Sequence, residues 1–147
     1  MERRDFIKRL EWAAAGALCA GATLSFMTGG CTGFRYVSYS IMGNRLVVRR
    51  VDFGAGSYAL LENPQIPRAI YLRRWPDDTF SALLTRCTHQ GCEVEPAGDR
   101  LACPCHGSEY SLTGDVLQGP AERALFAYTV TADAENIYIE LPDPEVL

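Results

Sequence analysis

Two short segments rich in cysteine and histidine constrain this chain more than any other feature. Residues 87–92 read CTHQGC and residues 103–108 read CPCHGS; we call them box one and box two. Together they contain both histidines and four of the six cysteines of the 147-residue sequence. Thiolates combined with imidazoles are typical ligands of iron and zinc. The boxes therefore predict a metal centre, and at this point both metals remain possible.

Box one can direct two side chains toward one metal centre. In extended backbone, residues i and i+2 point to the same side, so Cys87 and His89 can both face the centre while Thr88 points away. Gly91 would let the chain turn tightly in the same loop. One loop can thus supply one thiolate and one imidazole.

Box two offers a matching pair, Cys103 and His106. Pro104 lies between them and fixes one backbone dihedral angle. Gly107 would let the chain turn closely beneath a bound group. The two boxes together therefore provide two thiolates and two imidazoles.

The two boxes, followed by Glu109 and Tyr110, resemble the motifs of the Rieske iron–sulfur proteins, specifically the high-potential branch found in quinol-oxidising cytochrome bc complexes. This resemblance implies one 2Fe-2S cluster per chain, with thiolates on one iron and imidazoles on the other. The ligands that it implies are Cys87, His89, Cys103 and His106. It also implies a disulfide between Cys92 and Cys105, which would join the two loops.

The resemblance extends to residues that tune the cluster. Ser108 and Tyr110 stand where high-potential members place hydroxyl donors to a cluster sulfide and to a cysteine sulfur. Hydrogen bonds to sulfur stabilise the reduced cluster, so we expect a potential in the upper part of the Rieske range of roughly −150 to +300 mV. By the same resemblance, His106 is the candidate contact for a quinol.

The leading functional prediction is a one-electron carrier in a membrane quinol-oxidising complex. Its partners would be a cytochrome b-type subunit, quinol and a c-type cytochrome acceptor, and the chain would have no complete active site of its own. Alternatives are the small subunit of a periplasmic molybdenum oxidase of the arsenite-oxidase kind, paired with a large oxidase subunit, and a Rieske ferredoxin for an oxygenase. A zinc-bound structural domain fits less well, because zinc motifs usually pair cysteines as C-x2-4-C.

The sequence departs from the family pattern at three places: the loop that shapes docking, a position near the quinone contact, and the loop that covers the cluster. Only ten residues separate Cys92 from Cys103, fewer than in typical bc-complex members. Gln90 replaces a usual leucine, and Glu122 follows the Gly-Pro-Ala of residues 119–121 where a further proline is frequent. None of these departures changes a predicted ligand.

Residues 1–34 predict a signal or membrane anchor. Residues 3–8 read RRDFIK, close to the twin-arginine export pattern with Glu2 in place of a usual serine or threonine, and an uncharged Ala- and Gly-rich stretch follows at 12–34. We expect membrane attachment, through a retained anchor or through lipid at Cys31. The basic residues before the apolar stretch place the domain on the periplasmic side of a bacterial inner membrane, and a disulfide suits that oxidising compartment.

Residues 35–147 predict an all-β domain, an antiparallel Rieske-type β-sandwich with a small cluster-binding subdomain at about 85–118. Strand-like alternation occurs at 36–41, 45–53, 57–61, 69–74, 79–85, 125–131 and 137–141, separated by turn signals. After residue 11 the chain has ten arginines and no lysine against fifteen Asp and Glu. This acidic balance suits a basic partner such as a c-type cytochrome and argues against nucleic acid.

Overall fold

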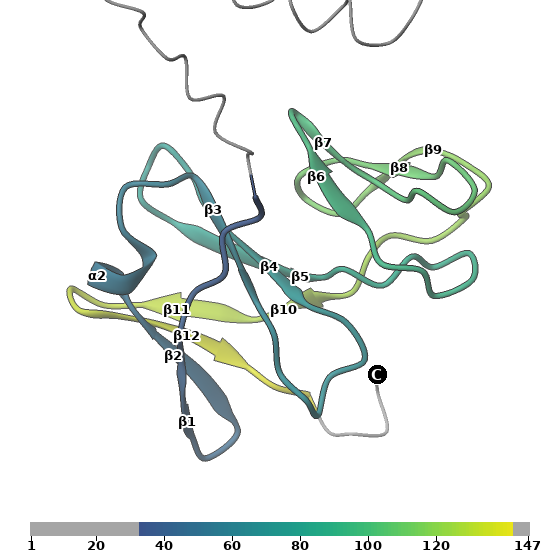
Figure 1. The fold of residues 1–147 in the computed structure, drawn as a ribbon. Coiled ribbons are helices and arrows are strands. Elements are labelled where there is room, and N and C mark those ends of the chain that lie inside the picture. The colour runs from purple at the N-terminus through teal and green to yellow at the C-terminus, as the bar shows by residue number, and fades with distance from the viewer. Residues whose placement is uncertain (1–32, 143–147) are drawn as a thin grey trace, which may run out of the picture. The chain divides into compact units, whose positions relative to one another are not determined.

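The computed structural model describes residues 33–142, and almost all of its regular structure is β-strand (Figure 1). Every pairing between its strands is antiparallel, which confirms the predicted fold class. The elements are β1 (Ser40–Met42), β2 (Arg45–Arg49), α2 (Arg50–Phe53), β3 (Tyr58–Leu61), β4 (Ile70–Arg74), β5 (Phe80–Leu84), β6 (Glu95–Ala97), β7 (Arg100–Ala102), β8 (Glu109–Tyr110), β9 (Val116–Gln118), β10 (Ala127–Tyr128), β11 (Val130–Ala132) and β12 (Asn136–Glu140).

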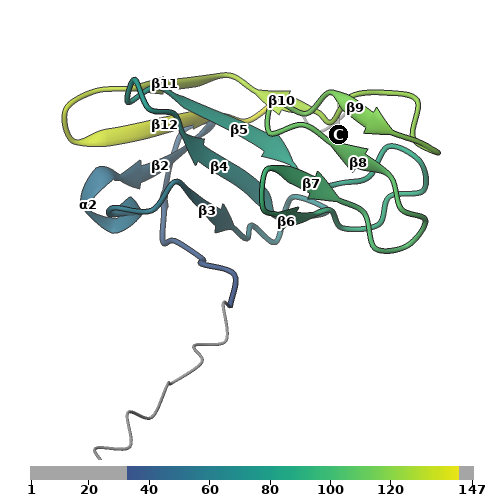
Figure 2. The same ribbon diagram turned by 90° about the horizontal axis from the view of Figure 1, so that it is seen from above.

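The strands form three sheets of four strands each. Sheet one has the order β1-β2-β12-β11, sheet two β10-β5-β4-β3, and sheet three β6-β7-β8-β9. Sheets one and two make the sandwich, while sheet three lies beyond one end of it (Figures 1 and 2). Both boxes belong to the part of the chain that builds sheet three.

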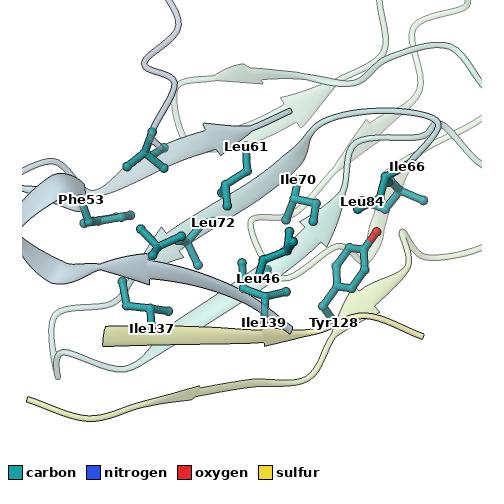
Figure 3. Close-up of a cluster of buried hydrophobic side chains, with 14 residues drawn as sticks. Leu46, Phe53, Leu61, Ile66, Ile70, Leu72, Leu84, Tyr128, Ile137 and Ile139 are labelled. Atoms are coloured by element: carbon teal, nitrogen blue, oxygen red, sulfur yellow. The ribbon is translucent and has the colours of Figure 1, made fainter. Parts of the chain in front are cut away.

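The core of the sandwich follows from side-chain alternation. In β2, Leu46 and Val48 are fully buried, and they pair in register with Ile139 and Ile137 of β12. These side chains meet Leu72 and its neighbours from sheet two in one hydrophobic cluster (Figure 3). Burying each such side chain contributes about 1.5–3 kcal/mol, so this core is the main source of the sandwich's stability.

The prediction of a single strand over residues 45–53 is wrong at its end. The strand stops at Arg49, and the helical turn α2 follows, ended by Gly54 at φ +65°. In a continuous strand, residues 51 and 53 would lie on the same face. The helical turn instead leaves Val51 exposed and buries Phe53 edge-on against Phe80.

The predicted strand at 125–131 is divided between two sheets. β10 pairs with β5 in sheet two, whereas β11 pairs with β12 in sheet one. Residues 36–41 also differ from the prediction, because Tyr36 makes only an isolated bridge to Leu60 and β1 begins at Ser40. Alternation along the sequence shows that a segment is extended but not which sheet it joins.

Sheet three and the boxes are inserted between two strands that are neighbours in sheet two. The chain leaves β5, forms box one, the β6–β7 hairpin, box two and the β8–β9 hairpin, and returns as β10. Ala127 of β10 lies directly opposite Leu83 of β5. A second hydrophobic cluster, which includes Leu83 of sheet two, Leu101 of sheet three, and Cys87 and Cys103 of the boxes, fixes this insertion to sheet two.

No helix among residues 33–142 has the length and apolar character that crossing a bilayer requires. The predicted twin-arginine signal, the anchor and the lipid-attachment candidate Cys31 lie outside the described residues. These three features therefore remain predictions from the sequence.

Candidate metal centre

Box one forms a tight turn held by two backbone hydrogen bonds. The amide of Cys87 donates to the carbonyl of Cys92 at 2.8 Å, and the amide of Gly91 donates to the carbonyl of Cys87 at 2.8 Å. Gly91 has φ +75°, a conformation that side chains with a β-carbon adopt only at a cost. The predicted role of this glycine in turning the loop is therefore visible in its backbone.

Box two repeats the same turn. The amide of Cys103 donates to the carbonyl of Ser108 at 2.8 Å, and the amide of Gly107 donates to the carbonyl of Cys103 at 3.0 Å. Gly107 has φ +76°, almost the value at Gly91. The first cysteine and the glycine of each box thus occupy equivalent positions in the two turns, whereas His89 stands two residues after its cysteine and His106 stands three after its own.

A disulfide joins the two turns, as the resemblance implied. Cys92 and Cys105 are bonded at 2.06 Å with their Cα atoms 6.5 Å apart. The sulfur of Cys103 lies close to this pair, and the three sulfurs fall within 4.8 Å of one another. Disulfide sulfurs are not thiolates, so this trio is not itself a metal site, because only a thiolate acts as a metal ligand.

The remaining donors are separated by depth. Cys87 and Cys103 are free thiols and are almost completely buried, at 3% and 2% exposure. His89 and His106 are exposed, and their rings lie 5.1 Å apart at an interplanar angle of 81°. The structure therefore brings all four predicted ligands to one place, with the sulfurs inside and the imidazoles at the surface.

The two free thiols have unequal surroundings. Burial raises the pKa of the Cys87 thiol, but hydrogen bonds from the Tyr110 hydroxyl and the His89 amide outweigh it, so that the pKa lies below its ordinary value. At Cys103, burial and the neighbouring Cys87 both raise the pKa. The hydrogen bonds together thus prevail over burial at Cys87, whereas burial prevails at Cys103.

Tyr110 is the centre of a hydrogen-bond network around box one. Its hydroxyl lies 3.3 Å from the Cys87 sulfur, 3.1 Å from the Thr88 hydroxyl, and accepts from the Thr88 amide at 3.1 Å. The Thr88 hydroxyl donates to the Arg123 carbonyl at 2.6 Å, so its proton is already used. Tyr110 is therefore the donor toward Thr88 or toward the Cys87 sulfur.

Thr88 is a residue whose role the sequence did not reveal. We expected it only to point away from the metal centre, whereas its hydroxyl joins box one to the segment that follows Gly-Pro-Ala at 119–121. A threonine between two candidate ligands carries no signal for such a contact, because Arg123 is 35 residues away and the acceptor is its main-chain carbonyl.

Ser108 provides an observation that tests whether an iron–sulfur cluster fits. Its side chain is fully buried, and its hydroxyl oxygen accepts a hydrogen bond from the Ala121 amide at 3.0 Å. Within residues 33–142 that hydroxyl has no acceptor for its own proton. A buried donor requires an acceptor, and a cluster sulfide beside Cys103 would supply one. Two thiols, two imidazoles and this spare donor fit a 2Fe-2S cluster.

The other predicted residues lie in exposed parts of the two turns. Pro104, next to Cys103, is exposed, and so is Gln90, which stands in box one where a leucine is usual. The segment at 119–121 reaches the centre through the amide of Ala121, as its bond to Ser108 shows.

The fold and the donor set define a β-sandwich protein with a metal centre between two disulfide-linked loops. Residues 35–129 match the family model described as the Rieske [2Fe-2S] domain. The chain belongs to this family, as its resemblance implied. The cofactor of the family is a 2Fe-2S cluster, so the zinc alternative is not favoured.

Relatives of known name agree with this assignment. The chain is 49% identical over 53 residues to the "Cytochrome b6-f complex iron-sulfur subunit" of Synechococcus sp. (strain JA-3-3Ab), a match that covers 35% of this chain and 31% of that protein. It is 29% identical over 148 aligned positions to the subunit of the same name from Microcystis aeruginosa, covering 92% of this chain and 82% of the relative. The chain thus spans about a third of the first of these relatives.

Among solved structures, the fold is similar to the cyanobacterial plasma membrane Rieske protein PetC3 from Synechocystis PCC 6803. The TM-score is 0.54 with 30% sequence identity, over 63% of this chain and 94% of that one. The similarity therefore covers nearly the whole of that Rieske protein.

Proposed function

We propose that Cys87 and Cys103 hold one iron of a 2Fe-2S cluster and that His89 and His106 hold the other. The observation that carries this proposal is the pairing of two buried free thiols with two exposed imidazoles on loops joined by the Cys92–Cys105 bond. When bound, the cluster supplies one-electron redox chemistry at the edge of the protein.

The residues around the cluster have separate tasks in this proposal. Tyr110 donates toward the Cys87 sulfur and Ser108 offers its unused proton to a sulfide, which favours the reduced state and a high potential. Burial of both thiols excludes water from the sulfur side. The exposed imidazoles leave the nitrogen side open to a redox partner, and His106 is the proposed contact for a quinol hydroxyl.

We propose that the chain works as the electron-transfer subunit of a membrane quinol-oxidising complex of the cytochrome bc type. The relatives named as cytochrome b6-f iron–sulfur subunits support this role. The partners would be a cytochrome b-type subunit, which binds the quinol, and a c-type cytochrome acceptor. The acidic balance of the chain after residue 11 suits a basic acceptor of that kind.

We further propose export by the twin-arginine route and attachment to the periplasmic side of the inner membrane. The support is in the sequence of residues 1–34, with its paired arginines, its uncharged stretch and Cys31. Twin-arginine export carries folded proteins, so a cluster assembled in the cytoplasm could cross intact.

Two measurements on the full chain test this function. Purified protein should contain two irons and two acid-labile sulfides, with the magnetic resonance signature of mixed cysteine and histidine ligation, and should titrate in the upper Rieske range. Purification from native membranes should recover a cytochrome b. A chain without iron would refute the cluster, and a large molybdenum subunit in place of cytochrome b would refute the proposed complex.

A further inference from the structure

A pocket of about 490 Å³ lies beside box one. Its lining residues are Leu84, Arg86, Cys87, Thr88, His89, Gln90, Gly91, Arg123, Ala124 and Phe126. No residue of box two lines it, and the candidate ligands Cys87 and His89 of box one belong to its lining. Its volume lies in the range of small-molecule sites in proteins, about 300–1,000 Å³.

Arg123, one of the lining residues, carries a cation whose guanidinium has no partner among residues 33–142. Most arginines of residues 33–142 donate to a carboxylate, a carbonyl or a tyrosine hydroxyl, and Arg74 lies over the Phe53 ring. Arg86 also has an interaction partner. Across that same stretch, Arg123 is the one arginine whose guanidinium has no hydrogen bond, ion pair or ring contact. Arg123 lines the pocket, and acidic residues outnumber basic ones in residues 33–142.

The main chain that carries Arg123 is fixed. The Thr88 hydroxyl donates to the Arg123 carbonyl at 2.6 Å, and Thr88 is itself held by Tyr110. Arg86 also lines the pocket and packs over box one, since a β-carbon at Gly91 would lie 3.4 Å from its Nε atom. The backbone of Arg123 is therefore held at the pocket by box one.

The remaining lining is partly apolar. Leu84 is buried, and Phe126 is partly buried, edge-on to the Tyr128 ring at 5.0 Å. Ala124 follows Arg123 directly in the sequence and presents only a methyl group. A ligand for such a site needs an acidic group for the Arg123 guanidinium and an apolar part that can contact the apolar lining residues.

We propose that this pocket binds a small organic carboxylate with an apolar or aromatic body, held by Arg123. A guanidinium recognises a carboxylate through two parallel hydrogen bonds, which a neutral analogue cannot reproduce. The site goes beyond the proposed electron transfer and does not depend on which complex the chain joins.

Binding at this pocket would influence the redox centre that we propose for the same loop. A carboxylate beside Cys87 and His89 adds negative charge near the cluster, and this opposes reduction. The ligand would then lower the midpoint potential, and by reciprocity it would bind more tightly to the oxidised form. This second consequence rests on the proposed function, whereas the binding itself does not.

Calorimetric titration of the purified full chain with benzoate tests the pocket directly. We expect saturable binding of benzoate and at least tenfold weaker binding of benzamide, which has the same ring without the charge. Arg123→Gln should weaken benzoate binding at least tenfold, and Arg123→Lys should restore part of it. Arg68→Gln removes the same charge from an exposed residue outside the pocket and should leave binding unchanged.

The outcomes separate the pocket from the cluster. Equal binding of benzamide, or unchanged benzoate binding by a folded Arg123→Gln variant, would overturn the carboxylate site even if the cluster were present. A chain without iron would refute the proposed function, while the benzoate titration would still decide the pocket. If both hold, benzoate should lower the midpoint potential of the wild type but not that of Arg123→Gln.

Discussion

Box one and box two have the same backbone but different surroundings. Each turn closes with the same two hydrogen bonds, and each has a glycine at nearly the same positive φ. The sulfur of Cys87 lies 3.3 Å from the Tyr110 hydroxyl and its pKa is lowered, whereas burial raises the pKa of Cys103. The turn is thus encoded within each box, while the surroundings of its cysteine also depend on residues outside it, such as Tyr110 at Cys87.

Tyr110 lies outside both boxes and contacts the box that is farther from it in the sequence. Ser108 and Tyr110 both follow the ligands of box two in the sequence, yet Tyr110 serves the cysteine of box one. Tyr110 of β8 therefore contacts box one although it follows box two in the sequence. The distinction between the boxes can be tested by changing matched pairs of residues.

The largest expected effect comes from the candidate imidazole ligands. His89→Ala and His106→Ala should each abolish cluster assembly, because either change leaves one iron with a single protein ligand. Iron and acid-labile sulfide content, with the magnetic resonance spectrum, measures this. Gln90 is an exposed neighbour in box one, and the control variant Gln90→Ala should keep both irons of the cluster. A variant that lost one histidine and kept a Rieske spectrum would break the equivalence of the boxes.

Removing the link between the boxes should come next. The Cys92→Ser, Cys105→Ser double variant should still assemble a cluster but lose it faster, because the loops are no longer held together. The bond joins residues 13 apart, and closing a loop of that size contributes about 3 kcal/mol. Denaturant unfolding and the decay of visible absorption under a chelator measure the two effects. Unchanged values in both assays would show that the ligands alone hold the loops.

The hydroxyl donors should affect potential more than stability. Tyr110→Phe and Ser108→Ala should each lower the midpoint potential, since each removes a donor to sulfur worth about 1–2 kcal/mol, or about 40–90 mV for one electron. Tyr128→Phe is the control, because burial raises the pKa of Tyr128 to about 12 and its hydroxyl has no partner within residues 33–142. Redox titration of all three decides the matter, and wild-type potentials throughout would contradict the role of both donors.

The smallest expected effect concerns the turns themselves. Gly91→Ala and Gly107→Ala should each cost about 1–2 kcal/mol of folding free energy, because both glycines have positive φ. The added methyl would meet only Arg86 at 3.4 Å in one case and nothing within 4 Å in the other, so the two costs should be similar. Gly33→Ala, in open space, should be neutral. Clearly unequal costs would show that the turns differ in more than their side-chain surroundings.

Much of the site could be predicted because its information is local. The spacing within CTHQGC and CPCHGS places a thiol and an imidazole on each turn, and the pairing of Cys92 with Cys105 followed from the resemblance. The bond from Thr88 to the Arg123 carbonyl could not be predicted, since it joins distant parts of the chain through a main-chain atom. The lack of a partner for the Arg123 guanidinium within residues 33–142 could not be predicted either. It becomes visible only when the partners of the other arginines are known from the structure.

The fold shows the same division. The antiparallel β character was predictable from alternation, but the helical turn at Arg50–Phe53 was not, because Val51 and Phe53 read as one face of a strand. The transfer of the chain from sheet two to sheet one between β10 and β11 was also missed. Both features arise from tertiary packing of Phe53 and of sheet neighbours, which short-range patterns do not contain.

The direct pairing of Leu83 with Ala127 has a consequence for how such proteins diversify. Adjacent strands lie only about 5 Å apart. The chain therefore leaves the sandwich for the two boxes and sheet three, and returns from them, at two neighbouring points. Lengthening, trimming or exchanging that unit would leave the register of β5 and β10 intact. The sandwich can thus act as a constant scaffold, and cluster-binding insertions of different length could be placed between β5 and β10 by evolution or by design.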